Sequence, residues 1–213
     1  MLVHGTRTSS AIWQPQAAAL RVHGHPVIAL DLPGHGSRHG ERFTFEGALA
    51  AIDEAVGSCD RPPLLVGLSL GGYTSLAYAG RHGDRIAGVV LAGCSTEIKG
   101  KPLRLYRRIA ARVTDWFHVG GWHVVTDMLG ALAGYSPLAD LRRLAMPVWL
   151  VNGQRDPLRL DERRYLRAAP LARLTVVPGA GHDVNTHRPA AFTSTLLDAL
   201  TELRLASGAQ ERI

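Results

Sequence analysis

The sequence contains no long hydrophobic run and very little cysteine. None of its apolar stretches approaches the roughly 20 residues that a helix needs to cross a bilayer, so we predict no membrane span. No charged and apolar leader precedes a small-residue cleavage site, which argues against a signal peptide. Cys59 and Cys94 are the only cysteines among 213 residues. Two cysteines cannot form a disulfide framework in a chain of this size, and we therefore expect a cytoplasmic protein.

Lysine is also scarce, because Lys99 and Lys101 are the only two among 24 basic residues. Arginine therefore carries nearly all of the positive charge, which exceeds the negative charge by 6. The densest basic stretch, residues 99–112, spaces its apolar residues as an amphipathic helix does, so we interpret its arginines as a solvated helix face. Nucleic-acid binding needs basic charge gathered on one face of a domain, and we predict no nucleic-acid partner.

Short apolar runs alternate with helical patterns along most of the chain. The runs are apolar throughout, as expected for parallel strands that helices cover on both faces. No linker or repeat divides the chain, so we predict a single domain over residues 1–213, of class α/β, with a mostly parallel sheet of about six strands. Residues 97–145 break the alternation with helical stretches. We therefore divide the domain into a core, residues 1–96 and 146–213, and a helical insertion between them.

A Gly-x-Ser-x-Gly pattern at residues 67–71 is the strongest chemical signal. It follows the apolar run 63–66 and precedes a helical pattern, and the order strand, turn and helix is typical of a nucleophile elbow. The turn is sharp and strained, and glycines on either side of Ser69 let the backbone pass closely because they lack a Cβ. The helix that follows points its positive N-terminus at the serine, where it favours an oxyanion.

Two more chemical groups follow later strands in the order expected for a catalytic triad. Asp156 comes after the apolar run 148–151, and His182 comes after the run 174–177. Parallel strands bring their carboxyl ends to one edge, so Ser69, Asp156 and His182 are expected to meet there. His182 is then the general base, and Asp156 holds its imidazole in the useful tautomer. Asp31, Asp140 and Asp183 are the rivals for the place of the acid.

An oxyanion hole requires two backbone N–H groups beside the serine. We predict that Leu70 supplies one of them, because it directly follows the nucleophile. Thr6 is our choice for the other, since it follows His4-Gly5 in the loop after the first strand.

These motifs together resemble the α/β-hydrolase superfamily, in particular its small serine esterase and C–C-hydrolase-like branch. The matching segments are His4-Gly5-Thr6, Asp31-Leu-Pro-Gly-His-Gly36, Gly67-Leu-Ser-Leu-Gly71-Gly72, Gly153-Gln-Arg-Asp156-Pro and Gly179-Ala-Gly-His182. The resemblance implies that Ser69, Asp156 and His182 are the triad. It also implies that the insertion 97–145 is a cap over the substrate pocket.

The predicted function is a serine hydrolase that cleaves a carboxylic ester of a small to medium, largely apolar small molecule. The same triad serves C–C bond hydrolysis, lactone opening and thioester cleavage, and a non-catalytic ligand-binding protein on this scaffold is a further alternative. The cap residues Trp116, Trp122, Met128 and Tyr135 either line the substrate pocket or pack cap against core. We predict no cofactor, and the paired histidines of the chain lack the neighbouring ligands of a zinc site.

The resemblance has one departure at the start of the chain. Family members usually carry two further strands before the His-Gly loop, whereas here that loop begins at residue 4. Either the start codon is misplaced or the chain is truncated. The run Val27–Leu30 would then become an edge strand with unpaired backbone groups, and we predict an exposed edge or a homodimer paired along it.

Overall fold

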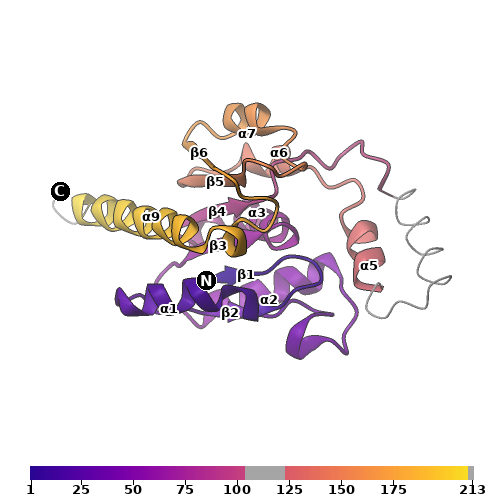
Figure 1. Cartoon of the computed structure of the whole chain (residues 1–213), viewed down its shortest axis with the longest axis horizontal. Helices are drawn as coiled ribbons and strands as arrows, with labels where there is room; N and C mark the ends of the chain where they lie inside the picture. The colour runs from indigo at the N-terminus through magenta and orange to yellow at the C-terminus, as the bar shows by residue number, and fades with distance from the viewer. Residues whose placement is uncertain (104–122, 211–213) are drawn as a thin grey trace.

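A computed structural model describes residues 1–103 and 123–210, and its centre is one parallel sheet (Figure 1). Six strands lie in the order β2-β1-β3-β4-β5-β6, and every neighbouring pair is parallel. The strands are β1 (Leu2–Val3), β2 (Ala29–Leu30), β3 (Leu64–Leu68), β4 (Gly88–Ala92), β5 (Val148–Gly153) and β6 (Ala172–Val177). The predicted class, the parallel sheet and the strand count are confirmed.

Helices connect the strands, as parallel neighbours require. The α-helices are α1 (Gln14–Val22), α2 (Phe45–Gly57), α3 (Leu70–Arg81), α5 (His123–Ala131), α6 (Pro137–Leu141), α7 (Glu162–Ala168), α8 (Val184–His187) and α9 (Pro189–Gln210). Short 3-10 helices cover Ser10–Trp13, Gly36–Arg38 and Gly83–Arg85. Thr44 caps α2, because its hydroxyl accepts the N–H of Gly47 at 3.0 Å.

Alternate residues of each central strand enter two separate cores. In β4, Val89 and Leu91 pack into one core with residues of α2, α3 and α6, whereas Val90 and Ala92 pack into the other. That second core is closed by the 3-10 helix Ser10–Trp13, α1 and α9, which contribute Trp13, Ala17, Leu20, Phe192, Leu196 and Ala199. Side chains on a strand alternate between its faces, so a strand covered on both faces must be apolar at every position. This explains the unbroken apolar runs of the sequence.

The two outer strands differ from the central ones. The predicted strand Val27–Leu30 is assigned only at Ala29–Leu30, and all four of its residues are half-buried. β6 is the opposite edge, and its residues Arg173 and Thr175 are exposed while their neighbours are half-buried. An edge strand lacks a neighbour on one side and is less covered by helices. This leaves β2 half-buried along its length, whereas β6 keeps only one apolar face.

Two helices of the predicted insertion make different contacts. α6 buries Leu138 and Leu141 in the core that contains α3, and it packs against α3 and α7. α5 lies away from the sheet, at the right of Figure 1, and it is tied to the loop before α2 by an ion pair in which Arg42 Nε lies 2.6 Å from Asp127 Oδ2. The description of 97–145 as a cap remains a prediction. No helix among the residues described is long and apolar enough to cross a membrane.

Candidate active site

Ser69 occupies the sharp turn between β3 and α3. Its φ is +52° and its ψ is −114°, a backbone conformation that costs a non-glycine residue of order 1–3 kcal/mol. The turn is held from both sides, because the N–H of Ser69 donates to the carbonyl of Ala92 at 2.8 Å and its own carbonyl accepts the N–H of Tyr73 at 3.0 Å. The strained conformation lifts the hydroxyl out of the sheet and leaves the serine half-buried.

The glycines around the serine are required by close backbone approach. A Cβ on Gly67 would collide with the carbonyl of Gly71, and a Cβ on Gly71 would collide with the carbonyl of Val3. Gly72 has the same constraint, because a Cβ there would meet the sulfur of Cys94. The crossing of α3 over β1 and β3 therefore permits no side chain at Gly67 or Gly71, whereas a side chain at Gly72 would press on Cys94, which follows β4.

The structure brings the three predicted triad residues together. His182 Nε2 lies 2.9 Å from Ser69 Oγ, and His182 Nδ1 lies 3.0 Å from Asp156 Oδ2. These distances suit a tautomer in which Nδ1–H donates to Asp156 while Nε2 accepts the proton of the serine. Ser69 follows β3, Asp156 follows β5, and His182 follows β6, so three strand ends supply the three groups.

The two ionisable partners shift each other's protonation. The hydrogen bond that His182 donates to Asp156 raises the pKa of His182 above its usual value, in spite of the opposing effect of burial. Burial alone would raise the pKa of Asp156, but the hydrogen bonds from His182 and from the N–H of Leu158 lower it overall. Asp156 is only 3% exposed, and these hydrogen bonds keep it ionised beside the imidazole in spite of its burial.

The loop after β1 lies beside the serine. Val3 and Gly67 are in register in the sheet, so the segments that follow them leave the sheet side by side. A Cβ on Gly5 would lie 3.4 Å from the Cβ of Ser69, which places Thr6 next to the nucleophile. Leu70 is the first residue of α3, where backbone N–H groups have no partner within the helix.

The four candidate pocket residues fall into three groups. Trp116 and Trp122 lie outside the described residues. Met128 of α5 reaches the loop after β1, where its sulfur accepts the hydroxyl of Thr6 at 3.0 Å. Tyr135 packs against the rings of Phe45 and Tyr73, at centroid distances of 5.1 and 6.5 Å, and belongs to the core.

The rival carboxylates have other partners. Asp31 accepts the N–H of Ser10 at 2.7 Å and the N–H of Ser37 at 2.8 Å, which together hold the loop after β2. Asp140 of α6 pairs with Arg143 at 3.2 Å. Asp183 follows His182, but the imidazole nitrogen that faces a carboxylate faces Asp156.

His4 has a structural place behind the same loop. It is fully buried, its Nδ1 lies 2.8 Å from the carbonyl of Gly5, and its Nε2 accepts the N–H of Leu32 at 3.0 Å. Burial lowers the pKa of His4 to about 4, so the ring is neutral and joins the two loops. Within residues 1–103 and 123–210, no group of three or more His, Cys, Asp and Glu side chains could hold a metal ion.

Sequence reasoning missed a buried polar cluster behind Asp156. The carbonyl of Thr96 accepts the hydroxyls of both Tyr73 and Tyr165, at 3.2 and 3.0 Å, and these tyrosines come from α3 and α7. In the sequence both tyrosines look like ordinary core aromatics, because only the tertiary structure points their hydroxyls at one carbonyl.

This chain is similar in sequence to several known proteins. The sequence model of the alpha/beta hydrolase family matches residues 1–195 of this chain. A pimeloyl-[acyl-carrier protein] methyl ester esterase of Neisseria meningitidis is 40% identical, over 81% of this chain and 82% of its own length. A protein of Rattus norvegicus that is provisionally named a protein-lysine deacylase is 28% identical, over 95% of this chain and 83% of its own length.

A solved structure shares the fold. A thermophilic esterase from Thermogutta terrifontis superposes with a TM-score of 0.78 at 24% identity, covering 95% of this chain and 89% of the esterase. At that identity the likeness concerns the fold alone.

Proposed function

The chain belongs to the alpha/beta hydrolase family, and on that premise we propose that it cleaves carboxylic esters through an acyl-enzyme formed on Ser69. The observation that carries the proposal is the unbroken chain of contacts from Ser69 Oγ through His182 to Asp156, at 2.9 and 3.0 Å. A serine hydroxyl is a weak nucleophile until a base accepts its proton, and His182 lies at hydrogen-bond distance to do so.

The first half of the reaction acylates the serine. Ser69 Oγ attacks the ester carbonyl carbon while its proton passes to His182 Nε2, and the carbonyl oxygen becomes an oxyanion. In this proposal the N–H groups of Thr6 and Leu70 bind that oxyanion, which is supported by the proximity of the loop after β1 to Ser69 and by the place of Leu70 at the start of α3. His182 then gives the proton to the departing alkoxide, the C–O bond breaks, and Ser69 remains acylated.

The second half releases the acid. Water attacks the acyl carbon while His182 takes one of its protons, and the tetrahedral intermediate collapses by breaking the bond to Ser69 Oγ. The proton held by His182 returns to the serine oxygen, so the enzyme is restored and a carboxylic acid leaves. Throughout, Asp156 stabilises the imidazolium without taking the proton.

The substrate class follows from the surroundings and from the relatives. Met128 brings an apolar side chain to Thr6, which suits a small to medium, largely apolar acyl group. The 40% identical relative is named as a methyl ester esterase, which agrees with a small alcohol as the leaving group. We therefore assign an ester of this kind rather than a thioester, a lactone or a C–C bond.

Ser69→Ala tests the proposal. We expect hydrolysis of p-nitrophenyl acetate to fall at least about a thousandfold while the variant folds as the wild type does. A fluorophosphonate probe should label the wild type and leave the variant unlabelled. A panel of esters, thioesters, lactones and Nε-acyl-lysine peptides then ranks the substrates. Equal activity in the variant, or a wild type that no probe labels, would refute the assignment.

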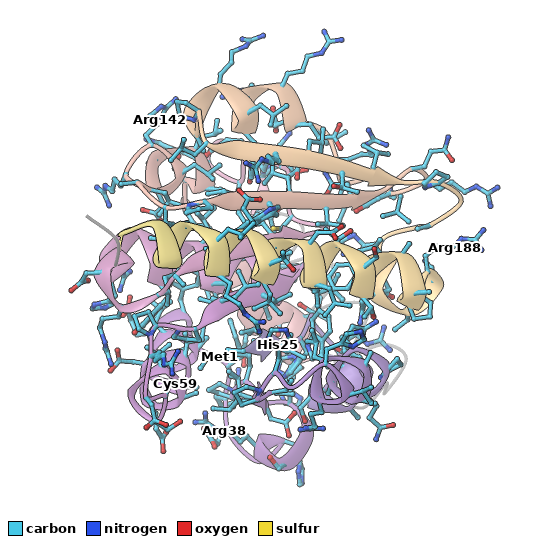
Figure 2. All side chains as sticks on the ribbon, turned by 90° about the vertical axis from the view of Figure 1, so that its left-hand side faces the viewer. Met1, His25, Arg38, Cys59, Arg142 and Arg188 are labelled. Atoms are coloured by element: carbon cyan, nitrogen blue, oxygen red, sulfur yellow. The ribbon has the colours of Figure 1, made fainter. Side chains whose placement is uncertain are left out.

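We propose further that two copies pair along the open edge of the sheet. β2 ends the sheet, and the carbonyl of Ile28 just before it accepts the N–H of Leu2, so the backbone groups of Ala29 point away from β1. Beside this edge is a hollow of about 690 Å³, and Figure 2 shows Met1, His25 and Cys59 of its lining near one another below α9. A second strand docked on the edge would satisfy the outward backbone groups.

Light scattering after size exclusion tests the pairing. We expect the mass of a dimer for the wild type, and a monomer for Ala29→Pro, which removes the outward N–H and leaves the bonds to β1 in place. A monomeric wild type at tens of micromolar would refute the dimer.

We also propose a cytoplasmic location, because Cys59 and Cys94 are both free thiols, and cell fractionation tests it.

A further inference from the structure

We propose that Thr96 is a positioning residue for the acid of the triad, holding the turn that carries Asp156 through its side-chain hydroxyl. This inference rests on the proposed function, since it assigns to Thr96 the placement of Asp156 against His182. Thr96 follows β4 and is itself distant in sequence from every member of the triad.

The carboxylate of Asp156 is divided between two partners. Its Oδ2 faces His182, while its Oδ1 accepts the N–H of Leu158 at 2.8 Å. A carboxylate that accepts the N–H two residues onward closes a small local turn. The orientation of the carboxylate toward His182 therefore depends on where the backbone of Leu158 is held.

The hydroxyl of Thr96 holds that backbone. Thr96 Oγ1 donates to the carbonyl of Leu158 and accepts the N–H of Leu160 at a long 3.5 Å. A hydroxyl has one proton to donate and lone pairs to accept, so it can make both bonds at once. Thr96 is 6% exposed, and its hydroxyl is therefore shielded from competition with water.

The backbone of Thr96 is fixed in turn by the two tyrosines. Their hydroxyls converge on its carbonyl from α3 and α7, and both tyrosines are buried. Tyr73 is one turn of helix after Ser69 and donates its backbone N–H to the serine carbonyl. Thr96 therefore links the helix of the nucleophile to the turn of the acid.

Neighbouring bonds support the same contact. The N–H of Asp161 donates to the carbonyl of Ser95, and the N–H of Glu97 donates to Asp161 Oδ2, both at 2.9 Å. Residues 95–97 thus lie along residues 158–161.

Apolar packing does not hold this turn. Leu158 and Leu160 are 45% and 64% exposed, and Pro157 between Asp156 and Leu158 is exposed as well. Hydrophobic burial, which positions most of the chain, therefore contributes little from residue 157 to residue 160. Hydrogen bonds from the hydroxyl of Thr96 hold this turn instead. We therefore assign this hydroxyl a role in the geometry of the triad and not in packing.

Thr96→Val and Thr96→Ser separate the hydroxyl from the methyl group. We expect Thr96→Val to lower kcat about 10–100-fold with little change in KM, as removal of groups that orient a site commonly does. Because Asp156 is then less well placed to raise the pKa of His182, the acid limb of the kcat/KM profile should move to lower pH. Thr96→Ser keeps the hydroxyl and should restore both. The control is Thr74→Val, which removes a different buried hydroxyl, one that belongs to α3.

A spectroscopic measurement keeps this test independent of turnover. The proton between His182 Nδ1 and Asp156 gives a downfield proton resonance, which should weaken or shift in Thr96→Val and remain in Thr96→Ser.

If the wild type hydrolyses no ester, the proposed function fails while this resonance still decides the role of Thr96. The proposal would be overturned if Thr96→Val kept the kcat, the acid limb of the pH profile and the proton resonance of the wild type. It would also be overturned if Thr96→Ser were as impaired as Thr96→Val. Should Thr96→Val fail to fold, Tyr165→Phe, which removes one of the two hydroxyls that hold the carbonyl of Thr96, should move the same resonance.

Discussion

Asp156→Asn replaces one of the two carboxylate oxygens by an amide NH2 group. The surrounding hydrogen bonds decide which oxygen is replaced. Oδ1 of Asp156 accepts a backbone N–H from Leu158, and Oδ2 accepts the Nδ1–H of His182. If the amide faced Leu158, two N–H groups would oppose each other at a residue that is 3% exposed, which costs about 1–3 kcal/mol. We therefore expect the remaining oxygen to face Leu158 and the amide to face His182.

This orientation imposes the wrong tautomer on the imidazole. The amide donates to His182 Nδ1, so the ring carries its proton on Nε2 instead. Nε2 then presents a proton to Ser69 Oγ at a site where it must accept one. The base is blocked although every buried group has a partner and the fold is preserved.

The expected loss is about 10⁴-fold in kcat, or about 5.5 kcal/mol of transition-state stabilisation. It combines the cost of restoring the reactive tautomer with the loss of the negative charge that stabilises the imidazolium. The matched control is Asp183→Asn, which removes a neighbouring carboxylate that acts on His182 only through its charge.

Initial rates of p-nitrophenyl acetate hydrolysis for both variants measure the difference, with thermal unfolding to show that each one folds. We expect Asp183→Asn to stay within about tenfold of the wild type, since a half-exposed charge is largely screened. An Asp156→Asn variant that also stays within about tenfold would refute the reasoning, because it would show that catalysis depends neither on the tautomer nor on the negative charge that Asp156 imposes.

Three further predictions follow from the elbow and the triad. The hydrogen bond to Asp156 raises the pKa of His182, and the base must be neutral to act. We therefore expect kcat/KM to rise with pH through a midpoint above the ordinary histidine value of about 6.5, and a midpoint below it would contradict the pKa shift. Ser69→Gly should unfold in urea with a free energy about 1 kcal/mol greater than that of Ser69→Ala, since only glycine adopts a φ of +52° without strain, and equal stabilities would show that the turn is unstrained. Gly72→Ala should lose about 1–3 kcal/mol of stability because its Cβ meets the sulfur of Cys94, and Cys94→Ala in the same chain should recover part of that loss if this clash is the cause.

Much of the fold could be predicted because it depends on local patterns. The unbroken apolar runs around residues 64–68 and 88–92 indicate strands buried on both faces, and the structure shows them paired in the middle of the sheet. The outer strands were harder to delimit, since Val27 and Ile28 look like their buried counterparts in the sequence. Whether a strand has a neighbour on each side is a property of the whole sheet, and no local pattern records it.

The candidate site could also be located in advance, because its residues follow strand ends. Any parallel sheet brings such ends to one edge, so Ser69, Asp156 and His182 could be grouped from their order along the chain. The residues that orient them could not. Thr96 follows a strand as well, but its contact with Leu158 depends on how two loops pass each other in space.

The sequence by itself determined the class of the fold, the place of the elbow and the residue types of the triad, because strand periodicity and glycine spacing act over a few residues. The sequence favoured Asp156 as the acid but left Asp31, Asp140 and Asp183 as rivals, and only the tertiary structure shows that the carboxylate facing His182 is that of Asp156. The tertiary structure also decided that the turn of Asp156 is held by a buried hydroxyl and not by its own exposed leucines. Hydrogen bonds need atoms within about 3 Å of each other, and in this site most of those atoms come from segments that only the folded sheet brings together.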